Sequence, residues 1–363
     1  MTPPTQVSAE VLEKLIVGFH GRELPDELRD LLAQGLGGVI LFSRNFRGAA
    51  ELKSLTAEIH RAAGQPVLIG IDQEGGTRFS LPEPFTQWAS PEELGKLDDE
   101  ELVERQAAAL AHELRSVGCN LDFAPMLDLH SHPNSPVTLG RSFGSHPQKV
   151  SRLGAAFARG LAKEGILACA KHFPGHGDAT VDPHLDLPIF RGDLKRLIAT
   201  ELVPFMELIS AKVPMIMTAH IFLPEIDAKL PASLSRKILR GILRDANFYG
   251  VILADDLGMG AIAKLRAPAE AAVLTFQAGS DMALICHDWN LVAPTIERLS
   301  SARAQGEFDQ DEWKASQRRI KRMRQKLLSA KKPIPGTDVV GCAEHHAIVE
   351  KIRSRLNGKL AQS

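Results

Sequence analysis

Eight short apolar segments recur along this chain of 363 residues, and a stretch with helical character follows each of them. The segments are rich in Val, Ile and Leu without polar alternation, which is typical of parallel strands buried on both faces. Amphipathic stretches that include 51–64, 148–165 and 235–248 separate them and predict helices. The apolar segments occupy residues 14–19, 37–42, 66–72, 120–126, 166–173, 213–220, 250–256 and 281–286.

Eight strand-then-helix units within about 300 residues favour an α/β fold of the (β/α)8 TIM-barrel type. An open doubly wound sheet is the alternative, but no Gly-x-Gly-x-x-Gly follows the first strand. We assign residues 1–330 to the barrel and 331–363 to a linker and a C-terminal helical tail, with a helix around Ala343–Leu360. The basic residues between 318 and 324 are expected on the solvated face of a packed helix, opposite Trp313, Ile320, Met323 and Leu327.

The overall charge of the chain restricts its partners. The 43 basic and 44 acidic residues almost cancel, so the chain lacks the positive field that drives non-specific binding to nucleic acid. No window approaches the length of a membrane span, and no secretory signal is evident at the N-terminus. The four cysteines form no CxxC pair. We therefore expect a cytoplasmic protein, a monomer or weak dimer, that binds neither nucleic acid nor membranes.

Polar side chains stand at the carboxyl ends of most of the predicted strands. A carboxylate or imidazole on an apolar strand is costly to bury without a partner. One such residue is compatible with a structural role, but a set at one end of a barrel predicts a polar active site. The set comprises Asp72 and Glu74, Asp128, Lys171 and His172, His220, Asp255 and Asp256, and His287 and Asp288.

The loop after the fifth predicted strand contains the densest group of chemically active side chains. It reads KHFPGHGDATVDPH over residues 171–184, and its glycines and prolines predict a shaped loop instead of a helix. Asp182 and His184 flank a proline, and we expect the carboxylate to fix the tautomer of the imidazole. This is the arrangement that a general acid/base requires.

Three motifs in this order resemble glycoside hydrolase family 3. They are DQEGG at 72–76, KHFPGHG with the following Asp-x-His at 171–184, and ADDLGMG at 254–260. The match is to the bacterial β-N-acetylglucosaminidase (β-hexosaminidase) branch and covers most of residues 14–290. The family usually has serine within Asp-x-His, where this chain has Pro183.

The resemblance implies a retaining exo-enzyme that removes terminal non-reducing β-linked N-acetylglucosamine (GlcNAc) without a cofactor or metal. It implies that Asp255 is the nucleophile and that His184 and Asp182 form the acid/base dyad. Strand alternation alone does not decide between Asp255 and Asp256. For sugar binding, the resemblance implies Asp72, Arg78, Arg141, Lys171 and His172. The expected substrate is a small GlcNAc-containing muropeptide or disaccharide in peptidoglycan recycling.

Two other functions stay open on the residues alone. The first is a metal-dependent barrel amidohydrolase that uses His172, His220 and Asp255 as ligands. The second is a non-catalytic barrel that only binds sugar. Activity that survives a chelator would argue against the first, and turnover of an aryl GlcNAc glycoside would exclude the second.

Overall fold

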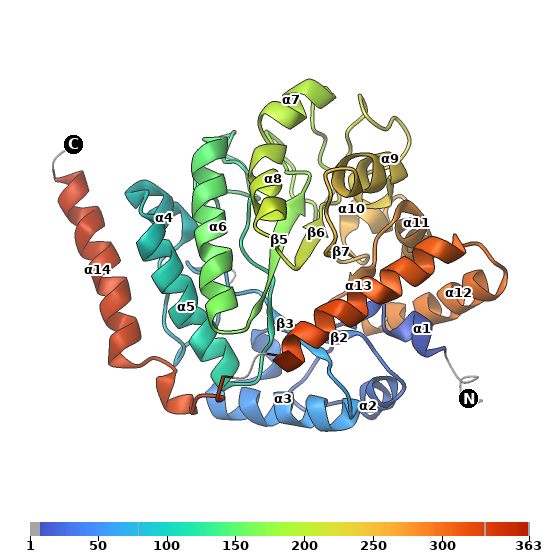
Figure 1. Ribbon diagram of the computed structural model, residues 1–363, viewed down its shortest axis with the longest axis horizontal. Helices are drawn as coiled ribbons and strands as arrows, with labels where there is room; N and C mark the ends of the chain where they lie inside the picture. Colours follow the sequence, from blue (N-terminus) through green and yellow to red (C-terminus); the bar gives the residue numbers. More distant parts are fainter. Residues whose placement is uncertain (1–7, 79, 330–331, 362–363) are drawn as a thin grey trace.

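The computed structural model of the protein describes residues 8–78, 80–329 and 332–361. Eight parallel strands pair in chain order and close on themselves through β1 and β8, so the fold is a (β/α)8 barrel (Figure 1). Each strand lies inside one of the eight apolar segments, which confirms the predicted fold class. The strands are β1 Leu15–Val17, β2 Gly38–Leu41, β3 Leu68–Ile71, β4 Leu121–Asp122, β5 Leu167–Phe173, β6 Met215–Thr218, β7 Val251–Ala254 and β8 Met282–Ile285.

Helices surround the barrel and extend beyond it at the C-terminus. The predicted helices at 51–64 and 148–165 form as α3 and α6, whereas the stretch at 235–248 forms the single turn α9 and then a π-helix, η3, over Leu239–Arg244. Short 3-10 turns are η1 Ser43–Asn45, η2 Ala232–Leu234, η4 Trp289–Leu291 and η5 Thr337–Val339. The α-helices are α1 Ala9–Leu12, α2 Asp26–Ala33, α3 Ala49–Ala63, α4 Pro91–Leu97, α5 Glu100–Ser116, α6 Pro147–Lys163, α7 Leu194–Ala199, α8 Leu202–Ser210, α9 Arg236–Ile238, α10 Gly260–Ala263, α11 Pro268–Ala278, α12 Val292–Ala304, α13 Gln310–Ser329 and α14 Ala343–Leu360.

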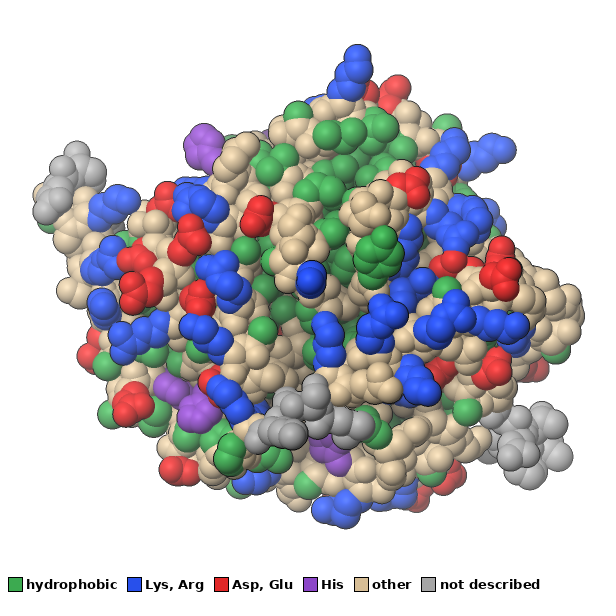
Figure 2. Space-filling view, in the orientation of Figure 1, with side chains coloured by type: hydrophobic (Ala, Val, Ile, Leu, Met, Phe, Trp, Pro, Cys, Tyr) green, Lys and Arg blue, Asp and Glu red, His purple; other side chains and the backbone are tan. Residues whose placement is uncertain are grey.

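Helix α13 crosses the end of the barrel at which the strands begin (Figure 1). Its Ile320 and Met323 are buried in the same apolar cluster as the side chains that fill the barrel interior. Lys14, just before β1, donates from Nζ to Ser316 Oγ at 2.6 Å, and burial lowers its pKa to about 8. Lys and Arg side chains follow the outward face of α13 (Figure 2), and Arg318, Lys321 and Arg322 are exposed as the helical pattern predicts. For two other basic residues the prediction is wrong: Arg319 is largely buried because it donates to the buried Asp281 at 2.9 Å, and Arg324 is largely buried beside Glu13. This end of the barrel is therefore closed, and the opposite end is left for a site.

The C-terminal helix α14 packs against α4 and α5 on the outside of the barrel. The buried carboxylate of Glu113 in α5 accepts hydrogen bonds from Thr86 Oγ1 at 2.6 Å, from the Gly341 backbone N–H at 2.9 Å and from His345 Nδ1 at 2.9 Å. The predicted boundary between barrel and tail, at residues 330 and 331, lies outside the described residues and stays a prediction. In the part of the chain that the structure describes, no helix combines the length and apolar character that a membrane span requires.

Candidate active site

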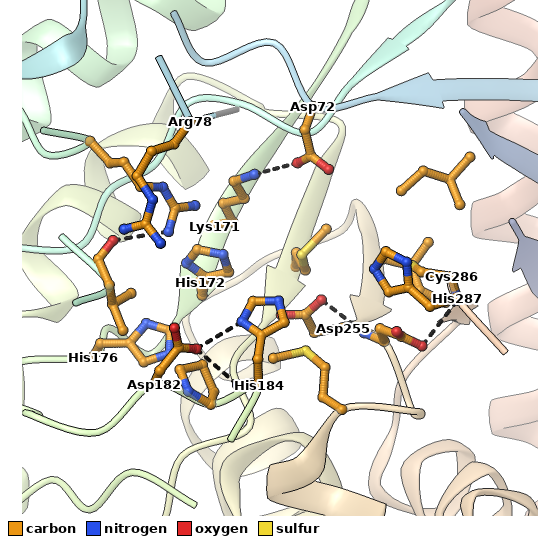
Figure 3. A pocket seen from close by; sticks show the side chains of 18 of the residues that line it. Asp72, Arg78, Lys171, His172, His176, Asp182, His184, Asp255, Cys286 and His287 are labelled. Atoms are coloured by element: carbon orange, nitrogen blue, oxygen red, sulfur yellow. Dashed lines mark hydrogen bonds and ion pairs between the residues drawn. The ribbon is translucent and has the colours of Figure 1, made fainter. Parts of the chain in front are cut away.

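A polar pocket opens at the carboxyl ends of the strands, the end opposite α13 (Figure 3). It encloses about 730 Å3, including the open space at its mouth. The structure brings all eight residues that the sequence assigned to catalysis and sugar binding to this one pocket. Its lining includes Asp72, Arg78, Arg141, Lys171, His172, His176, Asp182, His184, Asp255, Asp256, Cys286 and His287, together with the apolar Ile40, Phe42, Met217, Met259 and Leu284.

Two adjacent carboxylates, Asp255 and Asp256, follow β7 and differ in what they bind. Asp256 Oδ1 accepts the backbone N–H groups of Gly258 and Cys286, both at 3.0 Å, so it ties the end of β7 to the end of β8. Burial raises the pKa of Asp256 above its usual value. Asp255 lies partly exposed in the pocket, and among the described residues its carboxylate accepts one hydrogen bond, from the Asp256 N–H to Oδ1 at 2.8 Å. The structure therefore leaves Asp255 free to meet a substrate and commits Asp256 to the backbone.

The ionisation of Asp255 is favoured by the imidazoles around it. Burial alone would raise its pKa, but His172, His220 and the Asp256 N–H outweigh burial and hold the pKa below its usual value. An ionised carboxylate is what a nucleophile, or an electrostatic stabiliser of a developing cation, requires. Asp255 can therefore act as a nucleophile or as an electrostatic stabiliser, and it needs no general base to remove a proton first.

Asp182 and His184 form the predicted pair at the mouth of the pocket. Asp182 Oδ1 accepts both the backbone N–H of His184 at 2.9 Å and its Nδ1 at 2.8 Å. Burial raises the pKa of Asp182, but these two bonds outweigh it and leave the pKa lowered. Because Nδ1 is bound to the carboxylate, Nε2 is the nitrogen that remains to exchange a proton with a ligand. The His184 side chain is 54% exposed, as expected for a group that meets a leaving group at the pocket mouth.

A charged network forms the deeper wall of the pocket. Lys171 Nζ lies 2.6 Å from both Asp72 Oδ1 and Glu74 Oε1. Arg141 contacts the two oxygens of Glu74 from Nε and Nη2 at 2.8 and 2.7 Å. Burial would raise the pKa of Glu74, but Arg141 and Lys171 lower it to about 2. Glu74, to which the sequence assigned no role in the site, thus fixes two of the predicted sugar-binding cations.

The low pKa of Glu74 predicts a pH-dependent contribution to stability. A carboxyl depressed from 4.5 to about 2 on folding stabilises the native state above pH 4.5, and that stabilisation is lost as the pH falls toward 2. The shift corresponds to about 3 kcal/mol. We expect Glu74→Gln to unfold more easily than the wild type at pH 7, and its free energy of unfolding to fall less between pH 4.5 and 2.5. Urea titrations at several pH values measure this difference. Parallel pH curves for the two proteins would contradict the account.

Asp128 positions two histidines, His172 near the end of β5 and His176 in the loop that follows it. Its Oδ2 accepts from His172 Nδ1 at 2.6 Å, and its Oδ1 accepts the N–H and Nδ1 of His176 at 2.8 and 3.2 Å. Both imidazoles are therefore oriented with Nε2 away from the carboxylate, and within the described residues His176 Nε2 is buried without a partner. The sequence indicated Asp128 as a polar strand end but did not connect it with His172, because the two are 44 positions apart.

The metal-dependent alternative required His220 as a ligand, and the structure uses that side chain differently. His220 Nε2 faces the carbonyl oxygen of Asp256 at 3.0 Å, and Nδ1 faces Ser233 Oγ at 2.7 Å. Both ring nitrogens are thus engaged, and burial lowers the pKa of this imidazole. Within the described ranges, Asp128, His172 and His176 are the group close enough to share a cation, and the carboxylate already holds both imidazoles at Nδ1. The set His172, His220 and Asp255 is not favoured.

The sequence of the chain matches a known protein family. The family model described as the glycosyl hydrolase family 3 N terminal domain matches residues 9–323. The chain belongs to this family. The curated relatives include a β-hexosaminidase of Thiobacillus denitrificans, 39% identical over 296 residues, which are 79% of this chain and 82% of the relative. A β-hexosaminidase of Neisseria meningitidis is 39% identical over 275 residues, with 74% and 76% of the two chains covered.

Solved structures of the family superpose closely on the barrel. A family 3 β-N-acetylglucosaminidase from Paenibacillus is 34% identical with a TM-score of 0.91, over 95% of this chain and 68% of that one. NagZ from Neisseria gonorrhoeae, solved with N-trifluoroacetyl-D-glucosamine, is 32% identical with a TM-score of 0.76, over 93% and 96% of the two chains. The resemblance drawn from the three motifs is thereby confirmed, and the chain is a glycoside hydrolase.

Within this family context, Arg78 is the predicted sugar-binding residue with the least enclosed position. Its Nη1 donates to the Pro136 carbonyl oxygen at 2.6 Å, so it joins the loop after β3 to the loop after β4. Its charge also contributes to the lowered pKa of Asp182. Arg78 is therefore near enough to act on the charge of Asp182, and it lies to one side of Lys171 and Asp72 (Figure 3).

Proposed function

We propose that the protein is a retaining exo-β-N-acetylglucosaminidase that cleaves terminal, non-reducing β-linked GlcNAc. The observation that carries the proposal is the placement of Asp255 and of the Asp182–His184 pair in one pocket. The names of the β-hexosaminidase relatives support the choice of sugar. A non-catalytic sugar-binding barrel has no need of an acid/base pair of this kind.

In the first step, the Asp255 carboxylate attacks the anomeric carbon as the bond to the leaving oxygen breaks. The protonated imidazole of His184 gives its Nε2 proton to that oxygen, and the charge that develops on the sugar ring is stabilised by the carboxylate. Asp182, whose Oδ1 lies 2.8 Å from Nδ1, orients the ring and stabilises its charged form. The products of the step are the free aglycone and a glycosyl ester on Asp255.

In the second step, neutral His184 takes a proton from water, and the water oxygen attacks the anomeric carbon. The ester bond to Asp255 breaks, the carboxylate is released, and His184 is again protonated. Two inversions give overall retention of the β configuration. The rule that relates the separation of two carboxyl groups to stereochemistry does not apply, because one member of this pair is an imidazole.

The charged wall is proposed to hold the sugar hydroxyls. Lys171 is buried, and although burial would lower its pKa, Asp72 and Glu74 raise it, so the ammonium keeps its charge. An ammonium or guanidinium that is already held by carboxylates costs little ordering entropy when it donates to a hydroxyl. We assign this role to Lys171, Arg141, Asp72 and His172, with Arg78 nearer the mouth.

The proposed physiological substrate is a GlcNAc-containing muropeptide or disaccharide, cleaved in the cytoplasm during peptidoglycan recycling by a monomeric or weakly dimeric enzyme. This proposal is supported by the family to which the chain belongs. We expect no nucleic-acid partner, since the basic and acidic residues number 43 and 44.

A panel of p-nitrophenyl β-glycosides tests the sugar assignment. We expect kcat/KM for the GlcNAc glycoside to exceed that for the glucose and xylose glycosides by at least about 100-fold, the discrimination available from a site built for one substituent. Activity is expected to survive dialysis against EDTA. Comparable rates on glucose, or no turnover of the GlcNAc glycoside, would contradict the proposal.

A further inference from the structure

Glu113 in α5 lies outside the active-site pocket, and its buried carboxylate joins two segments that are far apart in the sequence. The carboxylate accepts the N–H and the Oγ1 hydroxyl of Thr86 at 3.2 and 2.6 Å. It also accepts the Gly341 N–H and His345 Nδ1, both at 2.9 Å. A buried donor that is left without its acceptor costs free energy, so these four contacts hold the two segments together.

On the Thr86 side, backbone hydrogen bonds lead from Glu113 to the turn that carries Glu74. The Trp88 N–H donates to the Thr86 carbonyl oxygen at 3.0 Å, and the Trp88 carbonyl oxygen accepts the Gly76 N–H, also at 3.0 Å. Glu74 lies two residues before Gly76, and its carboxylate holds the two buried cations of the charged wall. A shift of Trp88 therefore moves the backbone that places Glu74.

On the other side of Glu113, the start of the C-terminal segment packs directly on the same loop. The ring centroids of His345 and Trp88 are 5.4 Å apart. Gly341 has a positive φ of 64°, and a Cβ at this position would overlap the Pro84 carbonyl oxygen. The C-terminal segment therefore contacts the loop after β3 both through Glu113 and directly.

Helix α14 also supports the loop that carries Arg141, and it does so through α4. The two helices pack together beside the barrel (Figure 1), and Lys359 Nζ donates to the Lys96 carbonyl oxygen at 2.8 Å. Near the start of α4, Glu92 Oε2 accepts the N–H of Gly140, the residue before Arg141, at 3.1 Å. Both members of the ion pair between the loops after β3 and β4 are thus supported from the side of the C-terminal helix.

We propose that Glu113 is a positioning residue for sugar binding, and that through it the C-terminal helix holds Glu74 in place. The inference rests on the proposed function, because it concerns the wall that is proposed to hold the sugar hydroxyls. Glu113 does not line the pocket, so it acts on the position of Glu74 and not on the substrate. Binding groups have to be held to within about 0.5 Å by the residues behind them, which is the task that these contacts perform.

The dissociation constant (Kd) of GlcNAc, measured by isothermal titration calorimetry, tests the inference without a need for turnover. In Glu113→Gln one oxygen becomes an NH2 group, which cannot accept a hydrogen bond, so one of the facing donors loses its acceptor. We expect Kd to rise at least about five-fold, because a misplacement of about 1 Å can cost up to about 100-fold. His345→Ala removes only the C-terminal contact, and we expect it to raise Kd by a smaller factor.

A double-variant cycle with Glu74→Gln separates positioning from a loss of stability. If Glu113 acts through Glu74, the two changes are coupled, and Glu113→Gln should raise Kd by less than about two-fold in the Glu74→Gln background. Leu299→Ala is the matched control for stability, because Leu299 is buried in α12, which packs against α1 and α11. This variant should lower the thermal midpoint and leave Kd unchanged.

The outcomes separate this inference from the proposed function. Failure of the wild type to bind GlcNAc would overturn both, whereas binding without turnover of p-nitrophenyl β-GlcNAc would overturn the proposed function alone. An unchanged Kd in Glu113→Gln and His345→Ala, or the same fold-change in the presence and absence of Glu74, would overturn the positioning role alone. If Glu113→Gln does not fold, His345→Ala in the two backgrounds decides by the same criterion.

Discussion

Replacement of Asp255 by alanine is expected to lower kcat on p-nitrophenyl β-GlcNAc by roughly 10⁴- to 10⁶-fold, the range seen when a nucleophile or its catalytic unit is removed. The reason is that the adjacent carboxylate is not placed to substitute for it. Asp256 adjoins it, but its Oδ1 accepts two backbone N–H groups at 3.0 Å each. Steady-state kinetics with a saturating aryl glycoside measure the effect.

Asp256→Ala is the informative comparison for the Asp255 variant. It leaves the N–H groups of Gly258 and Cys286 without their acceptor, so we expect it to lower the thermal midpoint more than Asp255→Ala does. Full activity in Asp255→Ala together with an inactive but folded Asp256→Ala would reverse the assignment, and Asp256 would then be the nucleophile.

The effect on activity of removing the His184 imidazole is expected to depend on the leaving group. In His184→Ala we expect kcat/KM to fall by about 10²- to 10⁴-fold on GlcNAc disaccharides, which leave as poorly acidic alcohols and need a proton. On 2,4-dinitrophenyl β-GlcNAc, whose phenolate leaves unaided, glycosylation of Asp255 should be slowed only a few-fold. Measurement of kcat/KM on the two substrates tests this prediction, because kcat/KM reports the steps up to and including departure of the aglycone.

Replacement of Asp182 is a control for the hypothesis that His184 protonates the leaving group. Asp182→Asn keeps a hydrogen-bond acceptor for the His184 Nδ1 donor but removes the negative charge that stabilises the imidazolium. We expect a smaller loss than in His184→Ala, again larger on poor leaving groups than on the dinitrophenyl glycoside. Equal losses on both substrates in both variants would argue that the pair only shapes the loop.

The barrel and the polar residues that follow its strands were predictable from local sequence patterns. Arg78 and Arg141 were expected only from the resemblance to the family, and the contacts within the site depend on the fold. Eight apolar segments indicate eight buried strands because each segment can be recognised from its own few residues. The choice between Asp255 and Asp256 depends on the Cys286 N–H, which comes from the next strand, 30 positions away. The residue pattern of β7 does not show which aspartate makes this contact. Only the resemblance to glycoside hydrolase family 3 favoured Asp255.

Glu74 and Asp128 also have roles that local sequence patterns do not show. Both lie in segments that follow strands and were recognised as polar, but their roles depend on partners brought close by barrel closure. Glu74 meets Arg141 across 67 positions, and Asp128 meets His172 and His176 across 44 and 48. Each holds a charged or polar side chain that faces the pocket. The Asp182–His184 pair was predictable because its two members are separated by one residue, so their contact is local.

The central claim is that Asp255 forms a covalent bond to the sugar, and mass spectrometry of a trapped intermediate tests it most directly. A 5-fluoro derivative of β-GlcNAc fluoride should glycosylate the enzyme and be hydrolysed slowly, because the second fluorine destabilises the oxocarbenium-like transition states of both steps. After peptic digestion, we predict the mass of one fluorinated GlcNAc unit on the peptide that contains Asp255, with fragmentation placing it on that residue and no adduct in Asp255→Ala. An adduct on Asp256, or turnover that proceeds with inversion and leaves no adduct, would contradict the account.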